Sequence, residues 1–159
     1  MATVFIGVGS NVNPGLNIAK ALSLLANYCS EIAESPCYLS PGIDGAEGTF
    51  ANLVLRARTE LMPHDLVAAL KRTESACDRS KSQQTIDLDL LIYDDLCRED
   101  DVVKVPRSDI ERYPFVLKPL SELAPNERHP KLGLSYTELW AQSDFADHDL
   151  TLISRDSLA

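Results

Sequence analysis

The segment 85–93 carries a pattern that fits a strand with one buried face. Successive strand side chains point to opposite faces, so residues two apart share a face. One face holds four aliphatic residues: Ile86, Leu88, Leu90 and Ile92. The other face holds Asp87 and Asp89, which cannot enter a hydrophobic core without a partner. The pattern therefore predicts a sheet that is covered on one side and faces a cleft or solvent on the other.

The chain before this strand alternates between strand-like and helix-like patterns. Three strands are expected where β-branched and aliphatic residues gather: 3–8, 32–39 and 50–59. One helix is expected from Pro14, behind an Asn13 N-cap, to about Cys29, and a second from Pro63. The resulting βαββαβ order is ferredoxin-like, an α+β fold with an antiparallel sheet and helices packed on one face.

The remainder of the chain, beyond Asp95, is less periodic and reads as a C-terminal extension. Short helices are expected at 115–123 and 136–140, and an edge strand or a loose tail at 150–153. A chain of 159 residues fits one domain, so we treat 1–159 as a single domain.

Composition excludes several classes of partner. The formal net charge of −9 argues against a nucleic-acid binder held by phosphate contacts and against a binder of anionic membranes. No apolar run approaches the roughly 18 residues of a membrane-spanning helix, and the N-terminus lacks a basic leader. Four widely spaced cysteines without a CxxC pair predict reduced, mostly buried thiols in a cytoplasmic protein: Cys29, Cys37, Cys77 and Cys97.

The aspartate pair on the expected strand is the main candidate for chemistry. Asp87 and Asp89 should have Cα atoms about 6.5–7 Å apart, and two carboxylates at that distance repel unless a cation lies between them. Mg²⁺ suits such a pair, because it takes one or two carboxylates and completes its shell with water and phosphate oxygens. A merely solvated polar strand face explains the same spacing, and spacing alone leaves both interpretations open.

Several segments together resemble one enzyme family. They run in order along the chain: VFIGVGSN at 4–11, YLSP at 38–41, Asn52, TIDLDL at 85–90, VP at 105–106 and FVLKPLSELAP at 115–125. The set is similar to the 6-hydroxymethyl-7,8-dihydropterin pyrophosphokinases, folate-pathway enzymes that move pyrophosphate from ATP to a pterin alcohol. The likeness extends over about residues 2–140.

The resemblance implies roles for individual residues. Asp87 and Asp89 correspond to the catalytic pair that binds two Mg²⁺ ions bridging the ATP phosphates. Six positions resemble the pterin-binding residues: Ser40, Pro41, Ile43, Phe50, Asn52 and Phe115. Five positions fall where relatives support the nucleotide: Glu74, Arg79, Gln84, Arg107 and Arg112.

The chain also departs from the family at its basic residues. Relatives usually carry a longer, tryptophan-containing loop before the aspartate strand, whereas here only 80–84 link Arg79 to that strand. Gln84 stands where a phosphate-binding arginine is expected. Arg107 replaces a histidine and Tyr113 replaces an arginine, which leaves Arg107, Arg112 and Lys81 to compensate. Each lost cation should weaken ATP binding and the transition state.

The resemblance therefore predicts a Mg²⁺- and ATP-dependent transferase that pyrophosphorylates a reduced pterin. Two alternatives remain at this point. The chain could be a divergent paralogue that binds a pterin or nucleotide but is inactive or acts on a different pterin. It could also be a ferredoxin-like regulatory module without ligand chemistry. The expected partners are small molecules only, with no nucleic acid and no membrane, and the expected state is a monomer or a weak homodimer.

Overall fold

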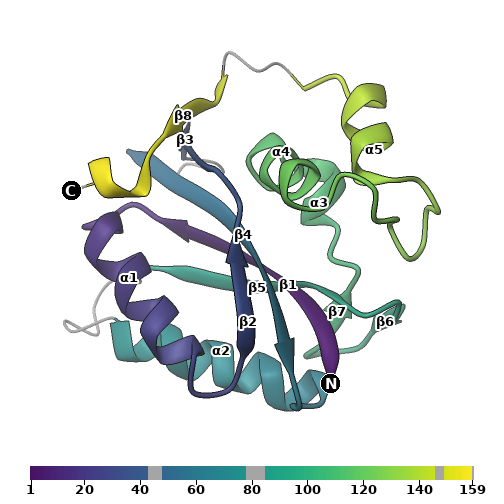
Figure 1. Cartoon of the computed structure of the whole chain (residues 1–159), viewed down its shortest axis with the longest axis horizontal. Helices are drawn as coiled ribbons and strands as arrows, with labels where there is room; N and C mark the ends of the chain where they lie inside the picture. Colours follow the sequence, from purple (N-terminus) through teal and green to yellow (C-terminus); the bar gives the residue numbers. More distant parts are fainter. Residues whose placement is uncertain (43–47, 78–84, 146–148, 159) are drawn as a thin grey trace.

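A computed structural model describes residues 1–42, 48–77, 85–145 and 149–158. Its main sheet is antiparallel throughout (Figure 1). The strands are β1 (Ala2–Ser10), β2 (Ser30–Glu34), β3 (Cys37–Pro41), β4 (Thr49–Thr59), β5 (Asp87–Tyr93) and β8 (Thr151–Ile153). Their order is β5-β1-β4-β3-β8, and β2 also pairs with β4. With α1 (Pro14–Leu25) and α2 (Pro63–Cys77), this arrangement confirms the ferredoxin-like prediction.

The two helices of the βαββαβ unit cover one face of the sheet (Figure 1). Side chains from β1, β4 and β5, such as Ile6, Leu55 and Leu88, pack there against Ile18 of α1 and Leu70 of α2. Burying such side chains is worth roughly 1.5–3 kcal/mol each, which makes this layer the main source of stability.

The C-terminal part of the chain covers a portion of the opposite face. It contributes a small hairpin and three helices: β6 (Arg98–Glu99), β7 (Lys104–Val105), α3 (Asp109–Arg112), α4 (Pro114–Leu123) and α5 (Tyr136–Gln142). A short 3₁₀ turn, η2 (Arg155–Ser157), follows β8. Val116, Leu117 and Leu120 of α4 pack on Phe5 and Val54 of the sheet, which forms a second core. Helices therefore lie on both faces of the sheet.

Local differences from the sequence prediction have clear causes. The first helix ends at Leu25 rather than near Cys29, and a turn follows in which the Cys29 N–H donates to the Leu25 carbonyl (2.8 Å). The strand expected at 32–39 is two strands, β2 and β3, separated by Ser35 and by Pro36, which has no N–H to donate. Ser35 keeps the break in register, because its N–H and its Oγ both bond to the backbone of β4.

A bulge in β5 changes the side of one predicted core residue. Phe5 pairs with Ile92 and Ile6 pairs with Leu90, so Leu91 is the extra residue. Ile86, Leu88 and Leu90 face α1 and α2 as expected. Beyond the bulge Ile92 turns to the second core, against the prediction that it would share their face.

Within the described residues, no helix is long and apolar enough to cross a membrane.

Candidate active site

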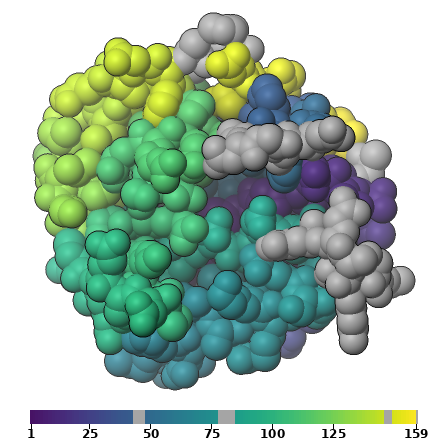
Figure 2. Space-filling model, turned by 180° about the vertical axis from the view of Figure 1, so that it is seen from behind, coloured from purple at the N-terminus to yellow at the C-terminus, as the bar shows by residue number. Residues whose placement is uncertain are grey.

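A cavity of about 230 Å³ opens on the sheet face that α1 and α2 leave uncovered. Its lining comes from β1, β3, β4, β5 and the segment around α3 and α4: Gly7, Val8, Gly9, Ser40, Pro41, Phe50, Asn52, Leu53, Asp87, Asp89, Leu91, Asp109, Tyr113, Phe115 and Val116. Figure 2 shows this side of the molecule, where β1 (purple) is visible in a hollow between green and teal atoms. Seven of the predicted site residues meet in this lining.

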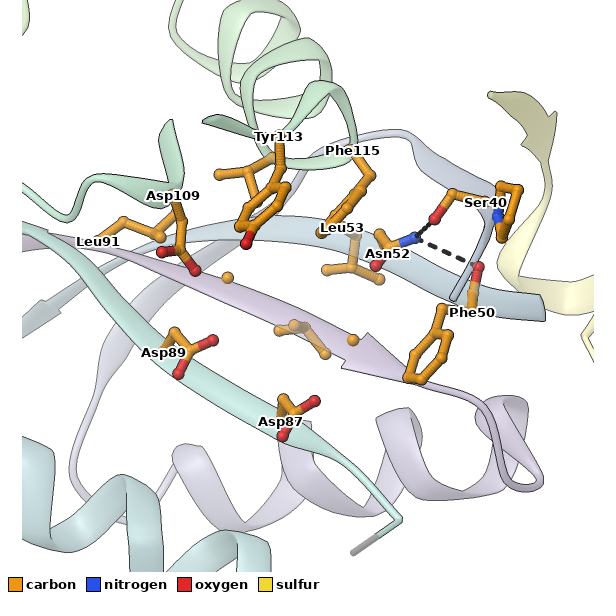
Figure 3. Close-up of a pocket in the computed structure, with 15 residues that line it drawn as sticks. Ser40, Phe50, Asn52, Leu53, Asp87, Asp89, Leu91, Asp109, Tyr113 and Phe115 are labelled. Atoms are coloured by element: carbon orange, nitrogen blue, oxygen red, sulfur yellow. Dashed lines mark hydrogen bonds between the residues drawn. The ribbon is translucent and has the colours of Figure 1, made fainter. Parts of the chain in front are cut away.

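Asn52 is held in one orientation by the backbone around it. Its Nδ2 lies 3.2 Å from the carbonyl oxygens of Tyr38 and Phe50 and 2.8 Å from Ser40 Oγ. Two of these acceptors are carbonyl oxygens, which cannot donate, so the amide nitrogen must face them. Asn52 Oδ1 therefore faces the cavity as a fixed acceptor for a ligand N–H (Figure 3).

Two glycines of β1 make room for a ligand above the strands. Gly9 pairs with Asp87 and with Asn52 on either side, and Gly7 pairs with Asp89. A Cβ at Gly9 would lie 3.4 Å from Asn52 Oδ1, the atom that faces the cavity. A side chain at position 9 would therefore lie against this acceptor.

Aromatic rings flank the Asn52 end of the cavity. Phe50 from β4 and Phe115 from α4 lie on different sides of Asn52 in Figure 3. The Tyr113 ring stacks on Phe115, with ring centroids 5.1 Å apart and an interplanar angle of 16°. Aromatic rings on either side of an amide that can hydrogen-bond to the edge of a ligand suit a flat heteroaromatic ligand.

Asp87 and Asp89 form the opposite, acidic end of the cavity (Figure 3). Both project from the same face of β5, as the alternation pattern predicted. Asp87 is exposed, whereas burial raises the pKa of the partly covered Asp89 above its ordinary value, and Arg107 acts against this shift. Confining a carboxylate in this way makes a neighbouring cation favourable.

Among the described residues, Arg107 is the cation that pairs with this acidic end. Its Nη2 lies 3.8 Å from Asp89 Oδ1, and its Nε lies 3.2 Å from Asp109 Oδ2. These carboxylates raise the pKa of Arg107 in opposition to burial, so the guanidinium stays charged. Arg107 also borders a smaller cavity of about 80 Å³ on the far side of Asp89.

That smaller cavity is lined by both aliphatic and charged side chains. Five aliphatic residues line it: Val67, Leu70, Leu88, Leu90 and Val102. Lys71, Lys104 and Arg107 supply positive charge around it, and Asp89 belongs to both cavities. Cations beside the aspartates suit a ligand that carries phosphate groups.

The residues present fit a magnesium ion at Asp87 and Asp89. Both offer hard carboxylate oxygens, the facing residues Gly7 and Gly9 have no side chains, and burial disfavours an uncompensated charge on Asp89. No group of three or more His, Cys, Asp or Glu side chains in the described parts of the chain could by itself enclose a metal ion. Two carboxylates with water and phosphate completing the shell match the coordination habit of Mg²⁺.

Glu74, at the end of α2, supports the aspartate strand from below. Its Oε2 accepts a hydrogen bond from the Leu88 N–H (2.7 Å). Burial raises the pKa of Glu74 above its ordinary value, the Leu88 hydrogen bond lowers it, and the nearby Asp87 and Asp89 raise it further. Glu74 therefore contributes to the negative field under the site rather than lining the main cavity.

Replacing Glu74 with glutamine is expected to stabilise the protein at pH 7. Because the folded-state pKa is raised, the ionised carboxylate costs stability, and this cost grows as pH rises from the unfolded pKa through the folded one. Melting temperatures of Glu74→Gln and wild type should converge near pH 4 and separate at pH 7, with the variant higher. Glu60→Gln, at an exposed side chain, is the matched control. A variant that melts lower at pH 7 would contradict the burial argument.

The remaining predicted nucleotide residues have different outcomes. Arg112 does not line the main cavity; its guanidinium lies over the Tyr113 ring (5.2 Å to the centroid) and borders another cavity of about 640 Å³. Ile43, Arg79, Gln84 and the alternative cation Lys81 lie outside the described residues.

Sequence reasoning missed three contributors to the site. Asp109 opens the short helix α3 in a region without periodicity, and no local signal links it to Arg107. Leu91 reaches the cavity beside the β5 bulge. Tyr113 was noted only as a departure from the family, although its position two residues before Phe115 already placed it near the aromatic wall.

Comparisons with known proteins identify the family of the chain. The sequence model of the family 7,8-dihydro-6-hydroxymethylpterin-pyrophosphokinase (HPPK) matches residues 5–125. A 2-amino-4-hydroxy-6-hydroxymethyldihydropteridine pyrophosphokinase of Aquifex aeolicus is 35% identical over 137 residues, which cover 82% of this chain and 85% of that protein. The protein of the same name from Haemophilus influenzae is 31% identical, with 94% and 97% covered.

Solved structures support the same fold. The chain superposes on HPPK-DHPS of Plasmodium falciparum, an S436F/A437G/A613S triple mutant with SDX-DHP, with a TM-score of 0.74 at 14% identity. The match covers 89% of this chain and 44% of the Plasmodium chain, so it spans less than half of that longer protein. The likeness to this structure concerns the fold, and the sequence matches decide the family. The chain belongs to the 7,8-dihydro-6-hydroxymethylpterin-pyrophosphokinase family.

Proposed function

We propose that this protein transfers pyrophosphate from ATP to the hydroxymethyl group of 6-hydroxymethyl-7,8-dihydropterin, in a magnesium-dependent reaction of folate biosynthesis. One observation carries the proposal: a single cavity joins a fixed amide and aromatic rings at one end to paired strand aspartates at the other. A ring that lies at the first end directs its substituent towards phosphates held at the second.

The pterin would occupy the Asn52 end. Its pyrimidine edge carries N–H donors, and Asn52 Oδ1 is an acceptor whose direction is set by two backbone carbonyls. Phe50 and Phe115 supply apolar faces for the ring, while Ser40 and Pro41 close the rim. Because the amide is already ordered before binding, little entropy is lost when the ligand arrives.

The nucleotide would occupy the basic side of Asp89. Its phosphates would extend past Lys71, Lys104 and Arg107 to the aspartates. Asp87 and Asp89 would hold Mg²⁺, which when bound offsets the phosphate charge and orients the groups for in-line displacement. Arg107, tied to Asp109, would keep a positive charge at the phosphates without the longer loop of relatives.

In the reaction, the acceptor oxygen attacks the β-phosphorus of ATP. The bond from that phosphorus to the oxygen bridging the α-phosphate breaks, AMP leaves with the electron pair, and the acceptor proton passes to water. The chain contributes mainly alignment, because the cavity fixes the ring at one end and the phosphates at the other.

The test is AMP formation from ATP, Mg²⁺ and hydroxymethyl-dihydropterin. AMP release that requires both the pterin and the metal supports the proposal. No AMP above an Asp87→Ala/Asp89→Ala control would overturn it and leave a divergent paralogue that binds without this chemistry. Calorimetry with the pterin alone would then separate a binder, whose heat Asn52→Ala abolishes, from an interaction module without a ligand.

Replacing Arg107 with glutamine is expected to weaken ATP binding by roughly tenfold, the usual effect of one charged contact. The same change should tighten Mn²⁺ binding to the nucleotide-free protein, because it removes a cation that already contacts Asp89. Calorimetric titrations measure both. Arg98→Gln, which breaks a similar ion pair with Asp100, is the control. If Arg107→Gln and Arg98→Gln lost ATP affinity equally, a role for Arg107 at the phosphates would be contradicted.

The proposal extends to the chain as a whole. Residues 1–159 would act as one domain and as a monomer or weak homodimer in the cytoplasm, with small molecules as partners. Two features support this reading: both cores share one sheet, and the four cysteines are free thiols.

A further inference from the structure

The Tyr113 side chain is held firmly at the centre of the site. Residue 113 joins α3 to α4: its N–H donates to the Asp109 carbonyl, and its own carbonyl accepts from Val116 and Leu117 (3.1 Å each). The ring stacks on Phe115 on the cavity side and has the Arg112 guanidinium over it. These backbone hydrogen bonds and the two ring contacts therefore set the direction of the hydroxyl group.

That hydroxyl points towards the floor of the cavity. In Figure 3 it lies between the Asp89 and Asp109 carboxylates on one side and the Phe115 and Asn52 end on the other. It makes no hydrogen bond to any described residue, so its donor is available to a ligand. A ligand that reaches from the ring site to the aspartates must pass beside it.

The chemistry of this position calls for a donor. The phosphate oxygens of a transferred group are acceptors, and the neighbouring Asp89 and Asp109 offer only acceptors when ionised. We infer that the Tyr113 hydroxyl donates a hydrogen bond to the pyrophosphoryl group as it passes from nucleotide to acceptor. This assignment rests on the proposed function. Tyr113 acts only as a hydrogen-bond donor, because the acceptor proton passes to water and the group is transferred by exchange of bonds at the β-phosphorus.

The test compares two nucleotides on Tyr113→Phe, which keeps the ring stack and removes only the hydroxyl. α,β-Methylene-ATP carries the β- and γ-phosphates but cannot transfer them, whereas AMP lacks both groups. Calorimetry with Mg²⁺ and saturating pterin should show the analogue binding roughly tenfold to a hundredfold more weakly to the variant. The affinities for AMP and for the pterin should stay within about twofold of wild type. Where turnover is measurable, kcat should fall at least as far.

Tyr93→Phe is the matched control, because it removes a tyrosine hydroxyl that bonds to the Leu61 carbonyl away from the cavity. It should leave all three affinities unchanged. Equal loss of AMP and analogue binding in Tyr113→Phe, loss of pterin binding, or no loss at all would overturn the inference. So would a wild-type protein that binds the analogue no better than AMP. The two proposals can also fail separately. If the wild-type protein forms no product, but Tyr113→Phe loses the preference for the analogue over AMP, the proposed function is wrong and the role of Tyr113 stands.

Discussion

Replacing Asp89 with asparagine is expected to lower turnover by about a hundredfold or more while leaving pterin affinity within about twofold of wild type. The change removes one of the two carboxylates proposed to hold Mg²⁺ at the phosphates, and losses of this size are typical when a charge-stabilising group is removed. Asn52 and the aromatic rings are untouched. Steady-state AMP formation over a range of Mg²⁺ concentrations measures the effect, and calorimetry with the pterin measures binding.

The melting temperature of Asp89→Asn provides an internal control. Burial raises the pKa of Asp89, so the ionised side chain costs stability at pH 7, and a neutral asparagine should melt no lower than wild type. Asp101→Asn, at an exposed aspartate outside the cavity, should change neither turnover nor melting. Full activity in Asp89→Asn, or a loss of activity that follows a fall in melting temperature, would contradict the metal assignment.

Replacing Asn52 with leucine is expected to weaken pterin binding by at least about a hundredfold and to leave ATP-analogue affinity nearly unchanged. The variant loses the acceptor that faces the ligand, and it removes the amide donor that contacts the Tyr38 and Phe50 carbonyls. A site built around a hydrogen bond discriminates strongly once that bond cannot form. Calorimetric titration with the pterin, and separately with α,β-methylene-ATP, distinguishes the two halves of the cavity.

Ser40→Ala is the comparison for Asn52→Leu. It removes one acceptor of the Asn52 amide but keeps both carbonyls that orient it, so pterin affinity should fall by less than about fivefold. If Ser40→Ala were as harmful as Asn52→Leu, the serine rather than the amide would read the ligand. If Asn52→Leu still bound the pterin, the Asn52 end of the cavity would not be the ring site.

Strand periodicity was sufficient to predict the sheet and the side on which the aspartates lie. Asp87 and Asp89 were placed by alternation alone, because a one-residue shift would have buried both carboxylates. Alternation failed at Ile92, where a bulge shifts the register. A bulge depends on pairing with β1, and no local pattern in β5 specifies it.

The site was only partly predictable for a related reason. Asn52 and Phe115 came from family motifs, and the structure adds the carbonyl contacts that orient the amide. Asp109 and Tyr113 belong to a segment without periodicity, which reaches the cavity only because α4 packs on the uncovered sheet face. Contacts of that kind depend on tertiary packing, which single-sequence patterns do not encode.

Phosphorus-31 NMR of the reaction mixture identifies which group is transferred. With ATP, Mg²⁺ and 6-hydroxymethyl-7,8-dihydropterin, the wild-type protein should produce AMP and a pterin that carries two coupled phosphorus atoms. The Asp87→Ala/Asp89→Ala protein should leave ATP unchanged. ADP with a singly phosphorylated pterin, or no phosphorus on the pterin at all, would show that the cavity does not carry out pyrophosphoryl transfer.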